Sequence, residues 1–324
     1  MKGRILSGHR VSGKLHMGHL FGTLFNWVKL QDEYECFFEI ADLHALTTDY
    51  EKTDELKRRI IDITKGWLAC GLTLDKSTLF VQSRVSEHAE LHLLFSMLVL
   101  VNRLERMPTL KEKIRDLNLH NRVNYGLLGY PVLQAADILV YKADAVPVGE
   151  DQLAHIEITR EIARKFNSLY REVFPEPKAL LTKFPRVPGI DGRRMAKSLQ
   201  NSILIDDDVD TIKQKVMRAY TDPKKIYKGD VGHPDGCVVF AYHELVNEAE
   251  LEQIRRDCTK GKLGCVDCKE GAAERLASYL KVYRDRMHGI KDDEVEEILE
   301  EGTRRAKVVA KRTLDEVKEA MKLL

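Results

Sequence analysis

Short apolar runs alternate with amphipathic stretches through the first half of this 324-residue chain. Four of the apolar runs have the length and composition of strands, at residues 4–7, 36–40, 79–82 and 145–148. Four longer stretches repeat apolar residues at helical spacing, at residues 21–30, 53–70, 87–99 and 152–166. Because strands that alternate with helices form a parallel sheet covered on both faces, the pattern predicts an α/β, Rossmann-like fold.

The second half of the chain has a different pattern, which is helical from about residue 205 onward. We therefore place a domain boundary near Asn201, with an α/β catalytic domain at 1–201 and an all-α domain at 202–324. Residues 100–141 lie between the two halves of the predicted sheet and are largely helical and rich in Arg and Lys. This segment is predicted to be a helical insertion in the first domain.

The composition is that of a soluble globular protein, with 44% hydrophobic and 32% charged residues. A net charge of +1 creates no overall field for nucleic acid, so any RNA contact must use local basic patches. No run approaches the roughly 18 apolar residues of a membrane span, and the first residues lack the apolar core of a signal peptide. We expect a cytoplasmic protein without a membrane partner, whose six cysteines do not form structural disulfides.

The first candidate for chemistry is His16-Met17-Gly18-His19, which follows an apolar run and a glycine-bearing turn and opens a helix. A strand, a turn and a helix N-terminus form a phosphate site, because free backbone N–H groups and the helix dipole face the anion. Gly18 lets a nucleotide lie close against the backbone. His16 and His19 are three residues apart on one helical turn, so both can face the same phosphate.

The second candidate is Arg194-Met195-Ala196-Lys197-Ser198, which places two cations among small residues in a segment punctuated by Pro and Gly. Taken alone, each motif fits a helix cap or solvated loop charges better than it fits a phosphate site. Two separate motifs that handle phosphate together imply a reaction on ATP. Neither G-x-x-x-x-G-K-S/T nor G-x-G-x-x-G occurs in the chain, which argues against the commoner nucleotide-binding folds.

At these residues the chain resembles the class I aminoacyl-tRNA synthetases, whose signatures are His-Ile-Gly-His and Lys-Met-Ser-Lys-Ser. Two further segments, YPVLQAADIL at 130–139 and VPVGEDQ at 146–152, resemble the amino-acid pocket of the tryptophanyl-tRNA synthetases. The resemblance runs from Ile5 to about Asn201 and continues more weakly to the C-terminus. It implies that L-tryptophan is activated by ATP to tryptophanyl-AMP and pyrophosphate, and that tryptophan is then transferred to tRNA(Trp).

The resemblance also implies roles for the signature residues. His16, His19, Arg194 and Lys197 would stabilise the charge that builds on the phosphate oxygens, together with Mg²⁺ that bridges the phosphates of ATP. Ala196 stands where the family signature has its first serine, which keeps both charges and removes one hydroxyl. Further ATP-binding residues implied by the resemblance are Gly18, Gly149, Glu150, Asp151, Met195 and Ser198.

Substrate choice is predicted to depend on Asp137, a carboxylate within an otherwise apolar helical segment, where burial is costly without a partner. In the tryptophanyl enzymes the matching Asp accepts the indole N–H, which would discriminate against phenylalanine. By the same resemblance, Tyr130 and Gln152 would hold the substrate ammonium group, and His44 would lie near its carboxylate. Gln134 stands on one side of the indole pocket, where many relatives have Met. A helical Asp that faces solvent is the alternative.

Three other functions remain open at this point. A tyrosyl enzyme shares the fold and needs a phenol-binding constellation, which the spacing of Gln134 and Asp137 permits but the VPVGEDQ segment disfavours. A small-molecule nucleotidyltransferase of the same sheet type uses a similar His-x-Gly-His motif but lacks a long helical domain. A catalytically idle RNA-binding relative is disfavoured by the presence of both signatures.

A homodimer is expected, joined through residues 100–141 and an apolar helical face next to them. Periodicity alone fits an ordinary core helix equally well, and the family resemblance favours the dimer. The apolar face consists of Leu91, Leu93, Leu94, Met97, Leu98 and Val101.

Four cysteines of the helical domain lie close together in sequence within 237–268, at Cys237, Cys258, Cys265 and Cys268. Their spacing, Cys-x20-Cys-x6-Cys-x2-Cys, suits a tetrahedral metal ion or a cubane cluster. Some tryptophanyl-tRNA synthetases carry a 4Fe–4S cluster in this region, so the resemblance implies the iron–sulfur-containing bacterial subtype, with structural Zn²⁺ as the alternative. Basic residues beside the cysteines would then meet tRNA, at Lys260, Lys262 and Lys269.

Overall fold

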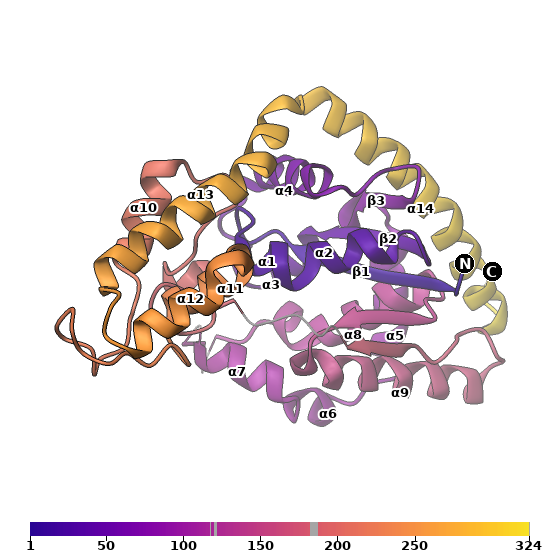
Figure 1. The fold of residues 1–324 in the computed structure, drawn as a ribbon. Helices are drawn as coiled ribbons and strands as arrows, with labels where there is room; N and C mark the ends of the chain where they lie inside the picture. The colour runs from indigo at the N-terminus through magenta and orange to yellow at the C-terminus, as the bar shows by residue number, and fades with distance from the viewer. Residues whose placement is uncertain (117, 120–121, 182–186, 324) are drawn as a thin grey trace.

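The structure, a computed structural model, describes residues 1–116, 118–119, 122–181 and 187–323. Its centre is a five-stranded parallel sheet with the strand order β3-β2-β1-β4-β5 (Figure 1). The strands are β1 (Arg4–Arg10), β2 (Glu35–Ala41), β3 (Ser77–Val81), β4 (Ala145–Val148) and β5 (Lys178–Leu181). The predicted α/β, Rossmann-like fold is therefore confirmed.

The edge strand β5 was not predicted from the sequence. It pairs with β4 over four residues, and its two terminal residues are exposed. Because its sequence Lys-Ala-Leu-Leu is short and begins with a charge, it does not stand out as an apolar run. Hydrogen bonding to β4, rather than a local pattern, defines this strand.

The first part of the chain supplies helices to both faces of the sheet. Ile5 and Phe38 point into a core cluster shared with the helices α2 and α4, whereas the neighbouring Leu6 and Phe37 point into a second cluster shared with α5, α8 and α9. This alternation is the two-residue period of a strand. The helical elements are α1 (Met17–His19), the π-helical turn η1 (Leu20–Leu24), α2 (Phe25–Leu30), α3 (Asp42–Asp49), α4 (Leu56–Cys70), α5 (Glu87–Ser96), α6 (Val101–Glu105), α7 (Pro108–Asp116), α8 (Tyr125–Val140) and α9 (Leu153–Leu169).

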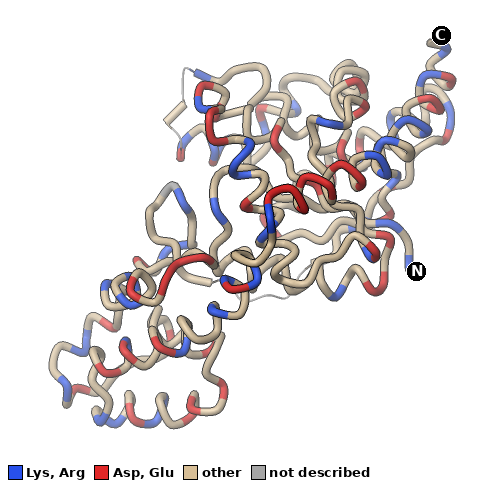
Figure 2. The backbone as a smooth tube through the Cα atoms, turned by 90° about the horizontal axis from the view of Figure 1, so that it is seen from above, with Lys and Arg blue, Asp and Glu red and all other residues tan. Residues whose placement is uncertain are grey.

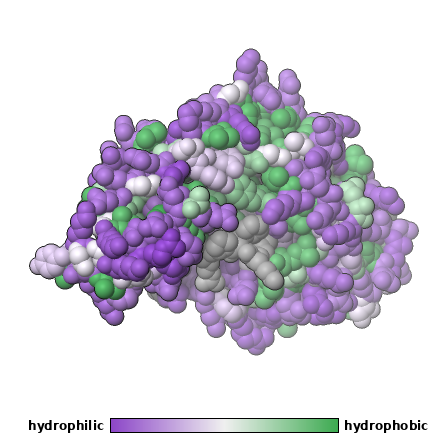
Figure 3. Space-filling model, in the orientation of Figure 1, coloured by the Kyte–Doolittle hydropathy of each residue, from purple (hydrophilic) through white to green (hydrophobic). Residues whose placement is uncertain are grey.

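The second part of the chain is helical, as predicted, and four of its helices gather at one end of the molecule (Figure 1). The face of this end seen in Figure 3 presents mainly hydrophilic residues. Among the helices described, none combines the length and the apolar character that a membrane crossing requires. The helices are α10 (Val209–Met217), α11 (Val238–Val246), α12 (Glu248–Thr259), α13 (Cys265–Gly289) and α14 (Asp292–Ala320).

The last helix, α14, runs back along the α/β part and covers β3 (Figure 1). Its first turns are acidic and basic residues follow further along (Figure 2). Gly302 lies against the backbone of Leu79, where any Cβ would overlap the carbonyl group. Ala306 and Leu314 belong to the same core cluster as the sheet. The division of the chain near Asn201 stays a prediction, and the packing of α14 ties the second part firmly to the sheet.

Candidate active site

The first signature motif lies where β1 gives way to a turn and to α1. His16 is the N-terminal cap of α1, and its backbone N–H donates to Nδ1 of His19 over 3.1 Å. The two imidazole centroids are 3.8 Å apart. Because Nδ1 of His19 accepts a hydrogen bond, the proton of the neutral ring is carried by Nε2. His19 is thereby prepared to donate a hydrogen bond to an anion.

Both signature histidines are held in the neutral form. Burial, together with the positive charges of Lys197 and Arg194, lowers the pKa of His16 to about 3. Burial, followed by the proximity of His16 and His9, lowers the pKa of His19 well below its ordinary value. Neutral imidazoles donate hydrogen bonds but carry no charge, so the positive charge for a triphosphate must come from other groups.

A third histidine, His9 of β1, lies beside the signature and was not predicted from the sequence. Its ring stacks on Trp27 with centroids 4.6 Å apart and lies 5.0 Å from the ring of His19. The indole N–H of Trp67 donates to Nδ1 of His9 over 2.9 Å, which leaves the proton of His9 on Nε2. Burial, then the charge of Lys197, lowers the pKa of His9 to about 3. A lone histidine in a strand gave no signal of this arrangement.

Main-chain hydrogen bonds anchor the segment after the second signature beside the first. The N–H of Met17 donates to the carbonyl of Ile203 over 3.0 Å, and the N–H of Ile205 donates to the carbonyl of Leu15 over 3.1 Å. The two motifs, about 180 residues apart in sequence, are therefore held together by the backbone.

Asn201 fixes the shape of the loop that carries the second signature. Its Oδ1 accepts from the N–H of Ala196 at 2.8 Å, and its Nδ2 donates to the carbonyl of Arg194 at 3.0 Å and to Asp191 at 2.8 Å. A Cβ on Gly189 would overlap the amide of Asn201, so this close approach requires glycine. Sequence reasoning placed only a domain boundary at this residue and missed its role in the loop.

The two cations of the second signature are placed differently. The side chain of Lys197 lies against Gly13 in the turn before α1. Burial, with the charge of Arg59, lowers the pKa of Lys197 to about 8. Arg194 has a side chain that is 83% exposed, and its Nη1 lies 3.8 Å from Oδ2 of Asp151. Lys197 is therefore the cation next to the signature histidines, whereas Arg194 faces solvent.

Met195 and Gly18 pack the two signatures against each other. Met195 is buried, and a Cβ on Gly18 would lie 3.8 Å from the Cβ of Met195 and 2.9 Å from the ring of His16. A larger residue at position 18 would therefore displace the histidine. The side chain of Ser198, the last residue of the predicted set, lies outside the described part of the structure.

The predicted ribose and adenine side of the site follows the end of β4. Gly149 caps the short turn η3 (Glu150–Gln152), whose residues Glu150 and Asp151 are exposed. A Cβ on Gly149 would come within 2.6 Å of Oδ1 of Asp151, so a larger residue here would displace the Asp151 side chain. The approach of Asp151 to Arg194 links the turn to the second signature loop. The nucleotide contacts of these residues stay predictions.

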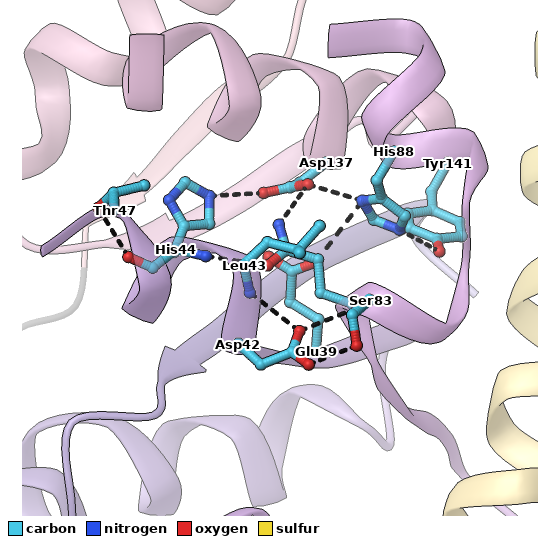
Figure 4. Close-up of polar contacts among 10 residues, drawn as sticks. Glu39, Asp42, Leu43, His44, Thr47, Ser83, His88, Asp137 and Tyr141 are labelled. Atoms are coloured by element: carbon cyan, nitrogen blue, oxygen red, sulfur yellow. Dashed lines mark hydrogen bonds and ion pairs between the residues drawn. The ribbon is translucent and has the colours of Figure 1, made fainter. Parts of the chain in front are cut away.

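Asp137 is fully buried in α8, and three side chains donate to its carboxylate (Figure 4). Oδ1 accepts from Nε2 of Gln82 at 2.8 Å and from Nδ1 of His88 at 2.6 Å, while Oδ2 accepts from Nε2 of His44 at 2.8 Å. Nε2 of His88 lies 2.7 Å from the hydroxyl of Tyr141. A carboxylate has about four lone-pair positions, so the three side-chain donors leave one, for which a ligand donor competes with the nearby carboxyl of Glu39.

The donors around Asp137 keep it ionised, and a neutral carboxyl lies behind it. Burial would raise the pKa of Asp137, but the hydrogen bonds from His44 and His88 outweigh burial and lower that pKa below its ordinary value. Burial, and then the negative charge of Asp137, raises the pKa of Glu39 well above its ordinary value. The two buried carboxyl groups therefore share a single negative charge, located on Asp137.

Tyr130, about two turns before Asp137 on α8, is held by groups from α7 and α9. Its hydroxyl donates to Oγ1 of Thr109 at 3.0 Å and lies 3.2 Å from Nε2 of His155. Nζ of Lys113 lies 3.7 Å from the centroid of its ring. Burial, with the charge of Arg10 nearby, lowers the pKa of Lys113 to about 8. Sequence reasoning did not single out Lys113, because a Lys on an amphipathic helix is normally solvated.

The remaining predicted pocket residues lie on α3, α8 and the turn η3. His44 of α3 contacts Asp137 directly. Gln134 is half-buried on α8, and Gln152 donates to the carboxylate of the residue before it at 3.1 Å. The structure thus joins His44 to Asp137, and the substrate contacts proposed for Tyr130, Gln134 and Gln152 stay predictions.

The four predicted cysteine ligands converge on one small cavity, although they come from separate segments of the helical region. They line it together with residues of α11, α12 and the loop before α11. Burial, then the charges of the other three thiols, raises the pKa of Cys268 to about 12. Burial also raises the pKa of Cys258. All four cysteines are unbridged, so four sulfur donors are available in one place.

A phosphate-binding signature at the carboxyl end of the first strand, with a cationic signature loop bonded beside it, is the arrangement of a class I aminoacyl-tRNA synthetase. Residues 2–281 match the family described as tRNA synthetases class I (W and Y), and the chain belongs to that family. This match covers both signatures, the segment around Asp137 and the four cysteines.

The similar proteins agree with this family over the whole chain. A tryptophan–tRNA ligase from Thermotoga maritima is 50% identical over 326 residues, which covers 99% of each chain. A tryptophan–tRNA ligase from Aquifex aeolicus is 43% identical, covering 99% of this chain and all of the relative. Among solved structures, the tryptophanyl-tRNA synthetase from Campylobacter jejuni in complex with ADP and tryptophan superimposes with a TM-score of 0.89 at 31% identity, over 99% of this chain and 100% of that one.

Proposed function

We propose that this chain is a tryptophan–tRNA ligase, which activates L-tryptophan with ATP to tryptophanyl-AMP and pyrophosphate and transfers tryptophan to tRNA(Trp) in the cytoplasm. The observation that carries the proposal is the buried, ionised carboxylate of Asp137, which three side chains hold in place and to which an indole N–H can donate. The names of the relatives, which align from end to end, give independent support.

In the activation step, the carboxylate of the amino acid attacks the α-phosphorus of ATP, and pyrophosphate leaves with the electrons of the broken P–O bond. The protein forms no covalent bond, so it contributes orientation and stabilises charge. His16 and His19 donate hydrogen bonds to phosphate oxygens, and Lys197 supplies positive charge beside them. Arg194, whose exposed side chain lies 3.8 Å from Asp151, supplies a second positive charge at the phosphates. Mg²⁺ that arrives with ATP neutralises further phosphate charge.

Selection of tryptophan follows from the hydrogen-bond count at Asp137. An indole N–H fills the remaining lone-pair position of the carboxylate, whereas phenylalanine brings no donor and leaves a buried charge incompletely bonded. A tyrosine hydroxyl donates but also needs donors for its own lone pairs. The N–H groups of Gln82, His44 and His88 that face Asp137 already donate to its carboxylate. An indole therefore matches this environment better than a phenol does.

The experiment that tests the proposal is ATP–pyrophosphate exchange with each of the twenty amino acids, followed by aminoacylation of tRNA(Trp). We expect exchange with tryptophan at least about a hundredfold above that with tyrosine or phenylalanine. Exchange with tyrosine alone would replace the proposal by a tyrosyl-tRNA synthetase. Absence of exchange with every amino acid would remove the ligase altogether and leave a nucleotidyltransferase or an RNA-binding relative.

At the four-cysteine cavity we prefer a 4Fe–4S cluster to zinc, because structural zinc sites commonly use two short cysteine pairs and only Cys265 and Cys268 form such a pair here. Cys237, Cys258, Cys265 and Cys268 would hold the cluster, which would serve as a structural support. Protein purified without oxygen should contain about four iron and four sulfide per chain, whereas one zinc per chain would exclude the cluster.

The basic residues beside the cavity suit a contact with tRNA. Lys260 and Lys262 are exposed in the turn between α12 and α13, whereas Nζ of Lys269 donates to the carbonyl of Met217 at 3.0 Å. Exposed lysines bind phosphates and position RNA without reading its sequence. Replacement of Lys260 and Lys262 by Ala should therefore raise the KM for tRNA(Trp) and leave ATP–pyrophosphate exchange unchanged. An unchanged KM would exclude this contact.

The apolar residues around the end of α5 support a homodimer. Leu91, Leu94 and Leu98 point into the core, whereas other members of the predicted face remain exposed together with their neighbour Leu100. Exposed apolar residues that are close in sequence and space indicate an interface. A mass of two chains at micromolar concentration is expected, and Met97→Glu should produce the monomer. A monomeric wild type would remove the dimer. The exposed residues are Leu93, Met97, Leu100 and Val101.

A further inference from the structure

His243 is a buried polar residue that none of the roles above uses. It lies on α11, is 2% exposed and faces the first turn of α13, where the last two cysteines stand. Its Nε2 lies 3.6 Å from Sγ of Cys268 and 3.1 Å from the carbonyl oxygen of the same residue. A buried imidazole at this distance from one thiol of the cavity affects that thiol through the proton on Nε2.

The position of that proton is set by a chain of groups that leads to the surface. Oε2 of Glu250 lies 3.0 Å from Nδ2 of Asn247, and Oε1 of Glu250 is paired with Arg275 at 2.5 Å. An ionised carboxylate only accepts, so the amide nitrogen of Asn247 must face Glu250. The same nitrogen lies 3.2 Å from Nδ1 of His243. Since an amide nitrogen only donates, Nδ1 accepts and Nε2 carries the proton.

We infer that His243 is a positioning residue of the four-cysteine site, whose Nε2–H is shared between the carbonyl oxygen and the thiolate of Cys268, with Asn247 and Glu250 fixing this tautomer. The inference rests on the proposed metal or cluster at the four cysteines. Donation to a ligating thiolate stabilises its negative charge and orients the sulfur, which slows loss of the bound group. In an iron–sulfur site it also stabilises the more negative reduced state, so it raises the reduction potential.

Lys225 is another buried polar residue close to the cavity, and it serves a different purpose. Its side chain lines the cavity, but its ammonium group donates to the carbonyl oxygens of Lys228 and Asp230. The ammonium group therefore stabilises the loop that follows Lys225. No hydrogen bond from it to a cysteine sulfur occurs among the described residues. His243 is the group for which the structure provides both a sulfur acceptor and a fixed proton.

The test compares four full-length proteins purified without oxygen: the wild type, His243→Phe, His243→Gln and Asn247→Leu. Phe keeps the ring volume without an N–H, and Gln restores a donor close to the position of Nε2. Asn247→Leu removes the hydrogen bond to Nδ1 of His243, so the proton is no longer fixed on Nε2, while the imidazole stays in place. Metal content, the rate of metal release to a chelator and, where iron is present, the reduction potential are measured on each protein. Tryptophan-dependent pyrophosphate exchange and thermal unfolding report on correct folding.

We expect His243→Phe to release the metal about tenfold to a hundredfold faster than the wild type, His243→Gln to restore most of the slow release, and Asn247→Leu to fall between. The reduction potential of His243→Phe should be lower than that of the wild type. Equal release rates and equal potentials in wild type and His243→Phe would overturn the role of His243.

Metal analysis of the wild type separates the two proposals. Zinc in place of iron and sulfide would exclude the cluster, and the zinc release rates of the same variants would still decide the role of His243. A wild type that holds no metal after purification and anaerobic reconstitution with iron and sulfide or with zinc would overturn both.

Discussion

The indole N–H of Trp67 donates to Nδ1 of His9 across 2.9 Å, beside the two adjacent histidines of the first signature. This bond connects α4 to β1 and fixes the tautomer of a buried ring that contacts His19. We predict that Trp67→Phe destabilises the fold by about 1–3 kcal/mol, because it leaves a buried acceptor unpaired. Urea unfolding of Trp67→Phe, His9→Met and the double variant measures the coupling between them. Strictly additive losses would contradict the hydrogen bond.

Glu39 should make the stability of the protein decrease as the pH rises. Burial raises its pKa in the folded state above the ordinary value of 4.5, so above that pH the unfolded state binds fewer protons than the folded state. The contribution of neutral Glu39 to the unfolding free energy is fully present below about pH 4.5. It is lost progressively as the pH rises to the pKa of Glu39 in the folded state, by up to about 1.4 kcal/mol per pH unit.

Glu39→Gln removes this loss, so the difference in unfolding free energy between the variant and the wild type should grow in favour of the variant from pH 5 to pH 8. The buried histidines titrate in both proteins and cancel in the difference. Asp137, whose pKa is lowered, is ionised throughout this range. A difference that does not vary with pH would show that Glu39 is ionised in the folded protein.

Lys197 should impose an upper limit on the pH range of activation. Its pKa is lowered to about 8 by burial and by Arg59, so the free enzyme loses the charge of Lys197 as the pH rises through 8. The value of kcat/KM for ATP reports on the free enzyme and should fall above about pH 8. In Lys197→Arg the fall in kcat/KM should begin only beyond about pH 9, because Arg stays charged. Lys197→Ala should lower the maximal rate with little effect on tryptophan binding, and the reverse pattern would contradict its role.

The α/β fold could be predicted from the sequence because four strands are continuous apolar runs, and their alternation with helices defines a parallel sheet. The candidate site could be predicted only in part. Asp137 stood out as a carboxylate in an apolar helix, but Gln82 and His88, which bond to it, come from the segment after β3 and carry no local signal. Likewise, the bond between His9 and Trp67 joins residues 58 positions apart. Such partners are set by tertiary packing.

The contact between α14 and β3 was also invisible in the sequence, and Gly302 tests it. A methyl group on this residue would overlap the carbonyl of Leu79, so Gly302→Ala should push the helix off the strand and cost about 2 kcal/mol or more in unfolding free energy. Gly289→Ala is the matched control, because a Cβ there meets nothing within 4 Å. Equal stability of the two variants, measured by urea unfolding, would exclude the close contact.

The central claim, that Asp137 selects tryptophan through the indole N–H, is tested most directly with β-(3-benzothienyl)alanine, which has nearly the shape of tryptophan but sulfur in place of the N–H. The measurement is kcat/KM in ATP–pyrophosphate exchange for both amino acids, in the wild type and in Asp137→Asn. We predict that the wild type prefers tryptophan by about a hundredfold or more, and that Asp137→Asn loses most of this preference while the protein stays folded. Equal use of the two amino acids by the wild type, or normal exchange with tryptophan in Asp137→Asn, would contradict the account.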